Sequence, residues 1–395
     1  MTPSRGTHFD SAVDMVEAAR RLVPLIVASR DEGEQIRRVP PRLAEALAEA
    51  GLLQMFLPRS MGGPELDPLA VFYAIEEISK ADGSIGWATM IATDVSLALG
   101  WLPAEIGRQL CSYPANFRGA GSLRPLGYAY PENGGYRIRG HWNFASGIDH
   151  ANWLYCPCIV MDEDKPQLTE AGTPKVRAML VPSDQATIQD TWSVVGMRGT
   201  GSQDFGLDDV WVPDTHTCFL GDPAIEAGPL YDPRLVFVIL FTAVVANSLG
   251  IARGAIEALI SLAAHVTSTR STDLLRDRPL VQTRLAEAEA ILNAARAYVI
   301  SAVGALWDKA CAGSSDQSLA IAQARLAIVH AMHEAVRSVD LVFHAAGTNA
   351  IYTRNPLERY FRDIHVAVQH NAAFPAQYES AGKVLMGLRP SDIGW

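Results

Sequence analysis

The stretch YRIRGHWNFAS, Tyr136 to Ser146, alternates between two kinds of side chain, in a chain whose other long segments repeat every three to four residues. Ile138, Trp142 and Phe144 share one parity with Ser146, whereas Arg, His and Asn side chains fall on the other. A period of two predicts a β-strand with one covered face. We therefore expect a β-domain inside a helical protein, with Ser146 beside Trp142 and Phe144 on the covered face.

The Ser146 hydroxyl needs a hydrogen-bond partner on such a face, because a polar group costs free energy when it is buried without one. Two interpretations are open. The hydroxyl closes a turn at the end of the strand, or it bonds a flat heterocycle stacked on the neighbouring aromatic side chains. The adjacent Asp149 and His150 are open to a similar choice between a structural turn and an acid–base pair.

The segments that flank the predicted β-domain have the spacing of helices. Residues 10–110 carry apolar side chains at intervals of three and four, and Gly and Pro become frequent from 115 to 215. Long helical segments with short connections follow and predict a bundle. They span 233–266, 279–312, 317–346 and 356–386. We expect an α+β fold, mostly α, made of a helical domain over 1–114, a β-domain over 115–228 and a helical bundle over 229–395.

The composition excludes several classes of protein. The chain has 395 residues and a net charge of −10, which argues against a nucleic-acid partner and an acidic membrane surface. Five scattered cysteines predict neither a disulfide framework nor a zinc site, and we expect a cytoplasmic protein without a signal peptide. The apolar stretch 235–252 is interrupted by Asn247 and Ser248, so we expect a helix buried within the bundle rather than a membrane span.

Other familiar sites are missing from the sequence. The Gly-rich segment from Gly196 lacks both the G-x-G-x-x-G and the Gly-Lys-Ser/Thr patterns, so no nicotinamide or phosphate-loop site is expected. A G-x-S-x-G nucleophile elbow is absent. His365 and His370 lie five residues apart, a spacing that does not suit a metal pair on one helix face. We expect no metal.

Several segments together resemble the acyl-CoA dehydrogenase family over nearly the whole chain. They are PRSMGGPELD (58–67), EEISKADGSIGW (76–87), YRIRGHWNFASG (136–147), MRGTGSQDFGLDDVWVP (197–213) and NPLERYFRDIHV (355–366). The resemblance implies N-terminal helices, a central β-domain and a C-terminal four-helix bundle. It also implies that the Ser146 hydroxyl bonds flavin N5, and we expect Arg362 and Asp363 to form a structural ion pair.

The departures from that family concern its catalytic base. The family places a glutamate after the Arg-Asp pair or on the first bundle helix, whereas this chain has Asn371 and Leu240 at those places and His370 before Asn371. Neither Asn nor Leu can remove a proton from a thioester at neutral pH. The segment after Arg270 also lacks the family's adenine-binding pattern, which favours FMN over FAD.

The segment FASGIDHANW and the late Gln369-His370 are instead similar to the two-component, group D flavin monooxygenases built on this fold. This resemblance implies reduced FMN or FAD supplied by a separate NAD(P)H:flavin reductase, molecular oxygen as co-substrate, and hydroxylation of an electron-rich aromatic or heteroaromatic through a C4a-hydroperoxyflavin. It also implies a homotetramer.

The same resemblance suggests a role for each candidate side chain. Ser146 would hold flavin N5, and His370 would stabilise or protonate the bound peroxide. The other candidates are Trp142 and Phe144 against the flavin, Arg198, Thr200 and Ser202 at its polar edge, and Asp94, Trp87 and Asn371 around the substrate. Three alternatives stay open: an acyl-CoA dehydrogenase with a relocated base, an N- or S-oxygenase with the same flavin chemistry, and a flavin-carrying protein without activity.

Overall fold

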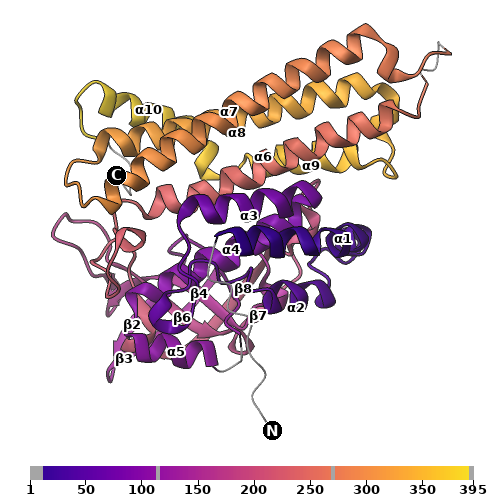
Figure 1. Ribbon diagram of the computed structural model, residues 1–395. Helices are drawn as coiled ribbons and strands as arrows, with labels where there is room; N and C mark the ends of the chain where they lie inside the picture. The colour runs from indigo at the N-terminus through magenta and orange to yellow at the C-terminus, as the bar shows by residue number, and fades with distance from the viewer. Residues whose placement is uncertain (1–11, 113–115, 268–271, 391–395) are drawn as a thin grey trace.

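The computed structural model describes residues 12–112, 116–267 and 272–390, and these form three blocks in chain order (Figure 1). The N-terminal helices are α1 (Ala12–Ile36), α2 (Pro41–Glu49), α3 (Pro68–Ala81), α4 (Gly83–Leu97) and α5 (Ala104–Ser112). The bundle helices are α6 (Val236–Ala263), α7 (Pro279–Cys311), α8 (Ser318–Ala346), α9 (Pro356–Ala367) and α10 (Pro375–Leu385). A sheet lies between them in sequence, so the predicted order of helices, sheet and bundle is confirmed, while the predicted boundaries at 114/115 and 228/229 stay a prediction.

The sheet is a mainly antiparallel structure with neighbours in the order β7-β8-β3-β2-β4-β6-β9. Its strands are β1 (Gly119–Gly121), β2 (Gly127–Glu132), β3 (Gly135–Ala145), β4 (Trp153–Asp162), β5 (Lys165–Pro166), β6 (Val176–Pro182), β7 (Thr187–Gln189), β8 (Gln203–Pro213) and β9 (Thr217–Cys218). Strand β3, the alternating stretch, pairs with β2 and β8. Helices α3 and α4 lie between the sheet and the bundle, where both contact α6 and α4 also contacts β1 (Figure 1).

The alternation of β3 breaks near its end, and the prediction that Phe144 shares a face with Trp142 is wrong. The pairing of β3 with β8 shifts between Trp142 and Ala145, and Phe144 has a φ of 62°. An extra residue in one strand reverses which side chains face the core. Trp142 is therefore fully buried, whereas Phe144 is 59% exposed and does not share its face.

The last predicted helix, 356–386, is broken in two. Helix α9 ends at Ala367, a short 3-10 turn spans Asn371–Ala373, and α10 begins at Pro375. Proline has no backbone N–H to donate and is tolerated in the first turn of a helix, so Pro375 starts a new helix rather than continuing α9. The break leaves His370 in the connection between two helices.

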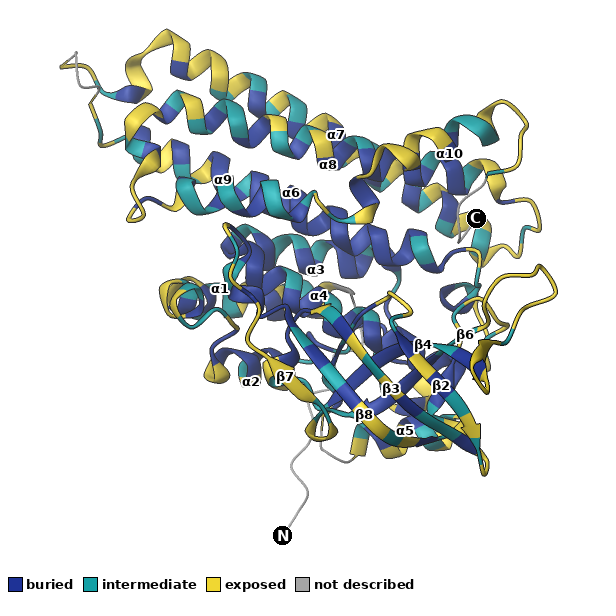
Figure 2. Cartoon of the chain, turned by 180° about the vertical axis from the view of Figure 1, so that it is seen from behind, coloured by how far each residue is buried: buried dark blue, intermediate teal, exposed yellow. Residues whose placement is uncertain are grey.

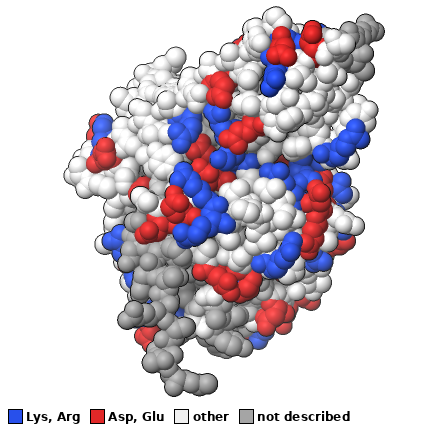
Figure 3. Space-filling view, turned by 45° about the vertical axis from the view of Figure 1, so that its right-hand side comes forward, with Lys and Arg blue, Asp and Glu red and all other residues white. Residues whose placement is uncertain are grey.

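Two helices, α6 and α7, are long and apolar enough to cross a membrane by length and composition alone. In α6, 89% of the apolar window is buried inside the protein, which confirms the predicted core helix. In α7 the corresponding share is 28%, and Figure 2 shows much of that helix exposed. On the face shown in Figure 3, basic and acidic side chains are interspersed.

Candidate active site

Three hydroxyl groups form a buried row where β3, the turn before β8 and α4 meet. The Oγ atoms of Ser146 and Ser202 lie 2.7 Å apart, and Ser202 Oγ lies 2.6 Å from Thr200 Oγ1. Trp87, on α4, donates from Nε1 to Ser146 Oγ over 3.2 Å. The structure thus brings together Ser146, Thr200 and Ser202, which the sequence analysis proposed as flavin contacts, and adds an indole donor that it had placed only at the substrate.

The backbone of a single residue, Met197, anchors the far end of this row. The Met197 carbonyl accepts from Thr200 Oγ1 at 2.9 Å and from Trp192 Nε1 at 3.1 Å, and its N–H donates to Asp363 Oδ1 at 2.5 Å. Met197 has a φ of 54°, a left-handed conformation that is uncommon outside Gly and is held here by these bonds. Neither Met197 nor its contact with α9 could be found from the sequence, because a positive φ leaves no signature on a Met.

Asp363 does not form the predicted ion pair with Arg362. Arg362 instead pairs with Glu358 and Glu34, each at 2.7 Å. Burial, together with the neighbouring carboxylate of Asp82, raises the pKa of Asp363 to about 7. Asp363 therefore links the bundle to Met197, the residue whose carbonyl ends the hydroxyl row.

His370 projects a neutral imidazole toward the same region. Its Nδ1 accepts from the backbone N–H of Ala372 at 3.2 Å, so the ring hydrogen of the neutral form sits on Nε2. The ring meets Trp87 and Phe241 edge-on, with centroids 5.6 Å and 5.8 Å away. Burial lowers the pKa of His370 to about 4, so the imidazole is a hydrogen-bond donor at neutral pH and not an acid.

Helix α4 presents a stripe of three side chains toward this region. All residues of α4 are buried except Trp87, Ile91 and Asp94. These three recur at i, i+4 and i+7 and so lie on one face of the helix. Asp94 lies two turns, or about 10 Å, further along the axis than Trp87. Because Trp87 contacts Ser146 and His370, the stripe runs from the hydroxyl row toward Asp94.

Asp94 is unlike the other polar groups of α4. The Thr93 hydroxyl donates to the Leu52 carbonyl, and the Ser96 hydroxyl donates to the Thr93 carbonyl. In contrast, Asp94 Oδ1 is buried and has no hydrogen-bond partner among the described residues. Burial raises the pKa of Asp94 well above its ordinary value, and no neighbouring charge opposes this. An unsatisfied buried acceptor on a stripe that lines the site is free to meet a ligand.

Four other predicted site residues do not take part in the hydrogen bonds of the hydroxyl row. Trp142 is fully buried in the sheet's own core, stacked on Phe205 with centroids 5.2 Å apart, which favours core packing over the predicted contact with a flavin. The Arg198 side chain lies 3.8 Å from Glu34 of α1, which gives no support to a place at the flavin's edge. Phe144 is exposed beside the row, and Asn371 is exposed next to His370.

The sequence departs from the resembling family at the two places of its catalytic carboxylate. Asn371 and Leu240 occupy the two places where the resembling family carries its base. Within the described ranges, no Asp or Glu hydrogen-bonds to Ser146, Ser202 or His370. The same ranges hold no cluster of His, Cys, Asp or Glu suited to a metal ion.

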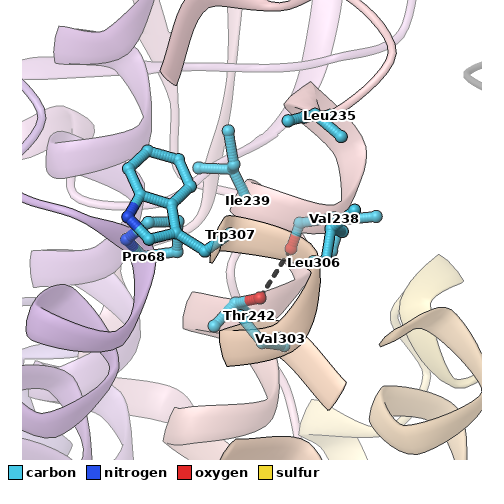
Figure 4. Close-up of a pocket in the computed structure, with 8 residues that line it drawn as sticks. All are labelled: Pro68, Leu235, Val238, Ile239, Thr242, Val303, Leu306 and Trp307. Carbon is cyan, nitrogen blue, oxygen red and sulfur yellow. Dashed lines mark hydrogen bonds between the residues drawn. The ribbon is translucent and has the colours of Figure 1, made fainter. Parts of the chain in front are cut away.

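A small cavity elsewhere in the fold is a packing feature and not a second site. It lies between the start of α3 and helices α6 and α7, and Figure 4 shows it lined by apolar side chains and one hydroxyl. That hydroxyl, Thr242 Oγ1, already donates to the Val238 carbonyl at 2.7 Å. Apart from Thr242 and the indole of Trp307, the side chains of this lining are apolar, as expected of a packing feature.

Comparison with known proteins agrees with the fold and the site. Residues 11–101 match the model of the acyl-CoA dehydrogenase N-terminal domain, and residues 242–375 match that of the C-terminal domain. Indole-3-acetate monooxygenase of Acinetobacter baumannii is 30% identical over 383 residues, which cover 97% of this chain and 96% of that protein. The chain belongs to the flavin-dependent monooxygenases built on the acyl-CoA dehydrogenase fold. This confirms the resemblance drawn from the sequence.

Further relatives of this monooxygenase are similar over their full length. The oxygenase subunit HsaA of Mycobacterium tuberculosis is 28% identical, with 96% of this chain and 97% of that protein covered. Its crystal structure superposes with a TM-score of 0.86 over 98% of this chain and all of that chain. The oxygenase component of the FADH(2)-dependent resorcinol hydroxylase of Rhizobium sp. is 28% identical over 96% of this chain and 95% of that protein. The relatives are oxygenases, so a dehydrogenase with a relocated base is set aside.

Proposed function

We propose that this monooxygenase takes reduced FMN or FAD from a separate NAD(P)H:flavin reductase and uses oxygen to hydroxylate an electron-rich aromatic or heteroaromatic. The observation that carries the proposal is the pairing of an open hydroxyl acceptor, Ser146, with a neutral N–H donor, His370 Nε2, neither of which is hydrogen-bonded to a carboxylate among the described residues. The names of the relatives, which include indole-3-acetate and resorcinol enzymes, support an aromatic substrate.

The residues around the hydroxyl row fit a flavin. Ser146 Oγ has an acceptor position left after its bonds to Trp87 and Ser202. Phe144, two residues earlier, is 59% exposed and meets Trp192 edge-on at 6.3 Å, so an aromatic surface lies beside the row. A planar heterocycle that covers Phe144 and places N5 at Ser146 would fill the open acceptor position and cover the exposed aromatic ring. Bound reduced flavin supplies the electrons that activate oxygen.

The other side chains position and shelter what is bound. His370 donates from Nε2 toward the oxygen, and the rings of Trp87 and Phe241 on either side exclude water from that bond. Thr200 and Ser202 hold the Ser146 hydroxyl in place. Only 28% of the apolar window of α7 is buried within the chain, which supports burial of this helix against other copies of the chain, and we propose a homotetramer.

The proposed function is tested by supplying each component separately. Protein, FMN or FAD, NADH, a flavin reductase and a panel of indoles and phenols should give a product that gains one oxygen atom, detected by mass spectrometry. Omission of the reductase should abolish the product. Oxidation of an acyl thioester without reductase would overturn the proposal.

We further propose that Asp94 Oδ1 accepts a hydrogen bond from a donor on the substrate, such as an indole N–H or an amine. Asp94→Ala should raise KM by about tenfold, the cost of one hydrogen bond to a buried group, with little change in kcat. Ser96→Ala is the matched control, because Ser96 lies on the same helix and already bonds to a backbone carbonyl. Equal KM values for wild type and Asp94→Ala would remove Asp94 from the substrate site.

Asp363 should make stability depend on pH. Since its folded-state pKa of about 7 lies above the ordinary value of 3.8, folding favours the protonated form. The folded protein then loses stability as pH rises between these values, by up to about 1.4 kcal/mol per pH unit. Asp363→Asn, which keeps an acceptor for the Met197 N–H, should flatten the fall of the unfolding midpoint between pH 5 and 7. An unchanged slope would contradict the assignment.

A further inference from the structure

The row of hydroxyls has a fixed direction of hydrogen bonding. It begins at an indole N–H, which can only donate, and ends at the Met197 carbonyl, which can only accept. Thr200 gives its one hydroxyl hydrogen to that carbonyl, so the 2.6 Å bond between Ser202 and Thr200 requires Ser202 to donate. The 2.7 Å bond then requires Ser146 to donate to Ser202, while Ser146 accepts from Trp87.

Nothing around the row can readily reverse it. Ser146, Ser202 and Thr200 are 3%, 3% and 1% exposed, so water cannot replace a lost partner. The accepting carbonyl of Met197 is held by Trp192 Nε1, and the N–H of the same residue is held by Asp363. To turn the Ser146 hydrogen toward a ligand, at least one of these hydroxyls would have to give up its acceptor inside the protein.

We propose that Thr200 and Ser202 hold Ser146 as a hydrogen-bond acceptor, so that the site binds flavin with a hydrogen on N5 and disfavours oxidised flavin. The inference rests on the proposed function, in which Ser146 faces N5. Reduced flavin carries an N5–H donor, whereas N5 of oxidised flavin is an acceptor. Ser146 held as an acceptor cannot bond to N5 of oxidised flavin, because neither atom then supplies a hydrogen.

The expected selectivity follows from the cost of one unmade buried hydrogen bond, which corresponds to a preference of roughly 10- to 100-fold for the reduced form. Thr200 and Ser202 act here as positioning residues and do not themselves touch the flavin. Their loss should therefore not simply weaken binding. It should free the Ser146 hydrogen to reach N5 of oxidised flavin.

Two variants test this directly. Thr200→Val removes the acceptor of Ser202, and Ser202→Ala removes the acceptor of Ser146; Thr200→Ser keeps the hydroxyl and is the matched control. The dissociation constants of oxidised and anaerobically reduced FMN, with FAD in a parallel series, are measured for wild type and each variant. The oxidised-to-reduced Kd ratio should be roughly 10 to 100 in wild type and Thr200→Ser, and should fall about tenfold in the other two through tighter binding of oxidised flavin.

A second readout separates selectivity from simple damage. Because the Kd ratio and the reduction potential are linked, each tenfold loss of preference should lower the potential of bound flavin by about 30 mV. An unchanged ratio, or equal weakening of both forms, would overturn the inference while leaving the proposed function intact. Binding of neither form by the wild type would overturn both.

Discussion

Ser146→Ala is expected to uncouple the enzyme, with at least a tenfold lower yield of hydroxylated product per reduced flavin and a matching release of hydrogen peroxide. The change removes the acceptor proposed for N5 and leaves the Trp87 indole N–H and the Ser202 hydroxyl without their shared partner. An unmade bond to a buried group costs about 1–3 kcal/mol, or a factor of roughly 5 to 150. Product and peroxide are quantified together in the reductase-coupled reaction.

A buried serine outside the site provides the control for this variant. Ser338 on α8 is fully buried and donates to the Ala288 carbonyl on α7, so Ser338→Ala removes a comparable hydroxyl from the bundle. It should keep the wild-type ratio of product to peroxide. If Ser146→Ala also kept that ratio, the hydroxyl would have no part in holding the flavin.

His370→Phe is expected to lower kcat by about 100-fold or more, the usual effect of removing one donor aimed at the reacting oxygen. The ring shape is kept between Trp87 and Phe241, while the Nε2 hydrogen is lost. His370→Gln places an amide N–H near the position of Nε2 and should restore part of the activity. Steady-state rates with saturating reduced flavin measure both.

The pH dependence separates a neutral donor from an acid. Because burial lowers the pKa of His370 to about 4, the imidazole stays neutral as pH falls from 8 to 5, and kcat should show no inflection near 6.5 from this group. His365→Phe is the matched control, because it replaces a different histidine, which lies on α9, half-exposed and 3.5 Å from Asp340. A rate that rises as His370 becomes protonated around pH 6.5 would contradict the neutral-donor role.

The sequence was sufficient for the architecture, because it follows from repeating patterns. The alternation of residues 136–146 marked the β-domain, and helical spacing on either side marked the flanking blocks. The absence of a base was equally visible, because Asn371 and Leu240 occupy identifiable places. The repeating patterns can be recognised in a single sequence because each of them depends on many residues.

The details of the site depended on single residues, and these were predicted less well. A bulge at Phe144 reversed the parity that had placed this ring beside Trp142, and one inserted residue has no periodic signal. Pro375 signals the break between α9 and α10, although the spacing of the apolar residues predicts one helix over 356–386. The anchor at Met197 arises from tertiary contacts with Trp192 and Asp363 that no local pattern encodes.

The order of events after oxygen meets reduced flavin on the protein tests the central claim most directly. The anaerobic complex of protein and reduced FMN is mixed rapidly with oxygenated buffer, and the loss of reduced flavin and the appearance of oxidised flavin are followed separately by absorbance. We predict a clear delay between the two in the wild type, shortened in Ser146→Ala and His370→Phe. Simultaneous loss and appearance in the wild type, with all the oxygen recovered as hydrogen peroxide, would contradict it.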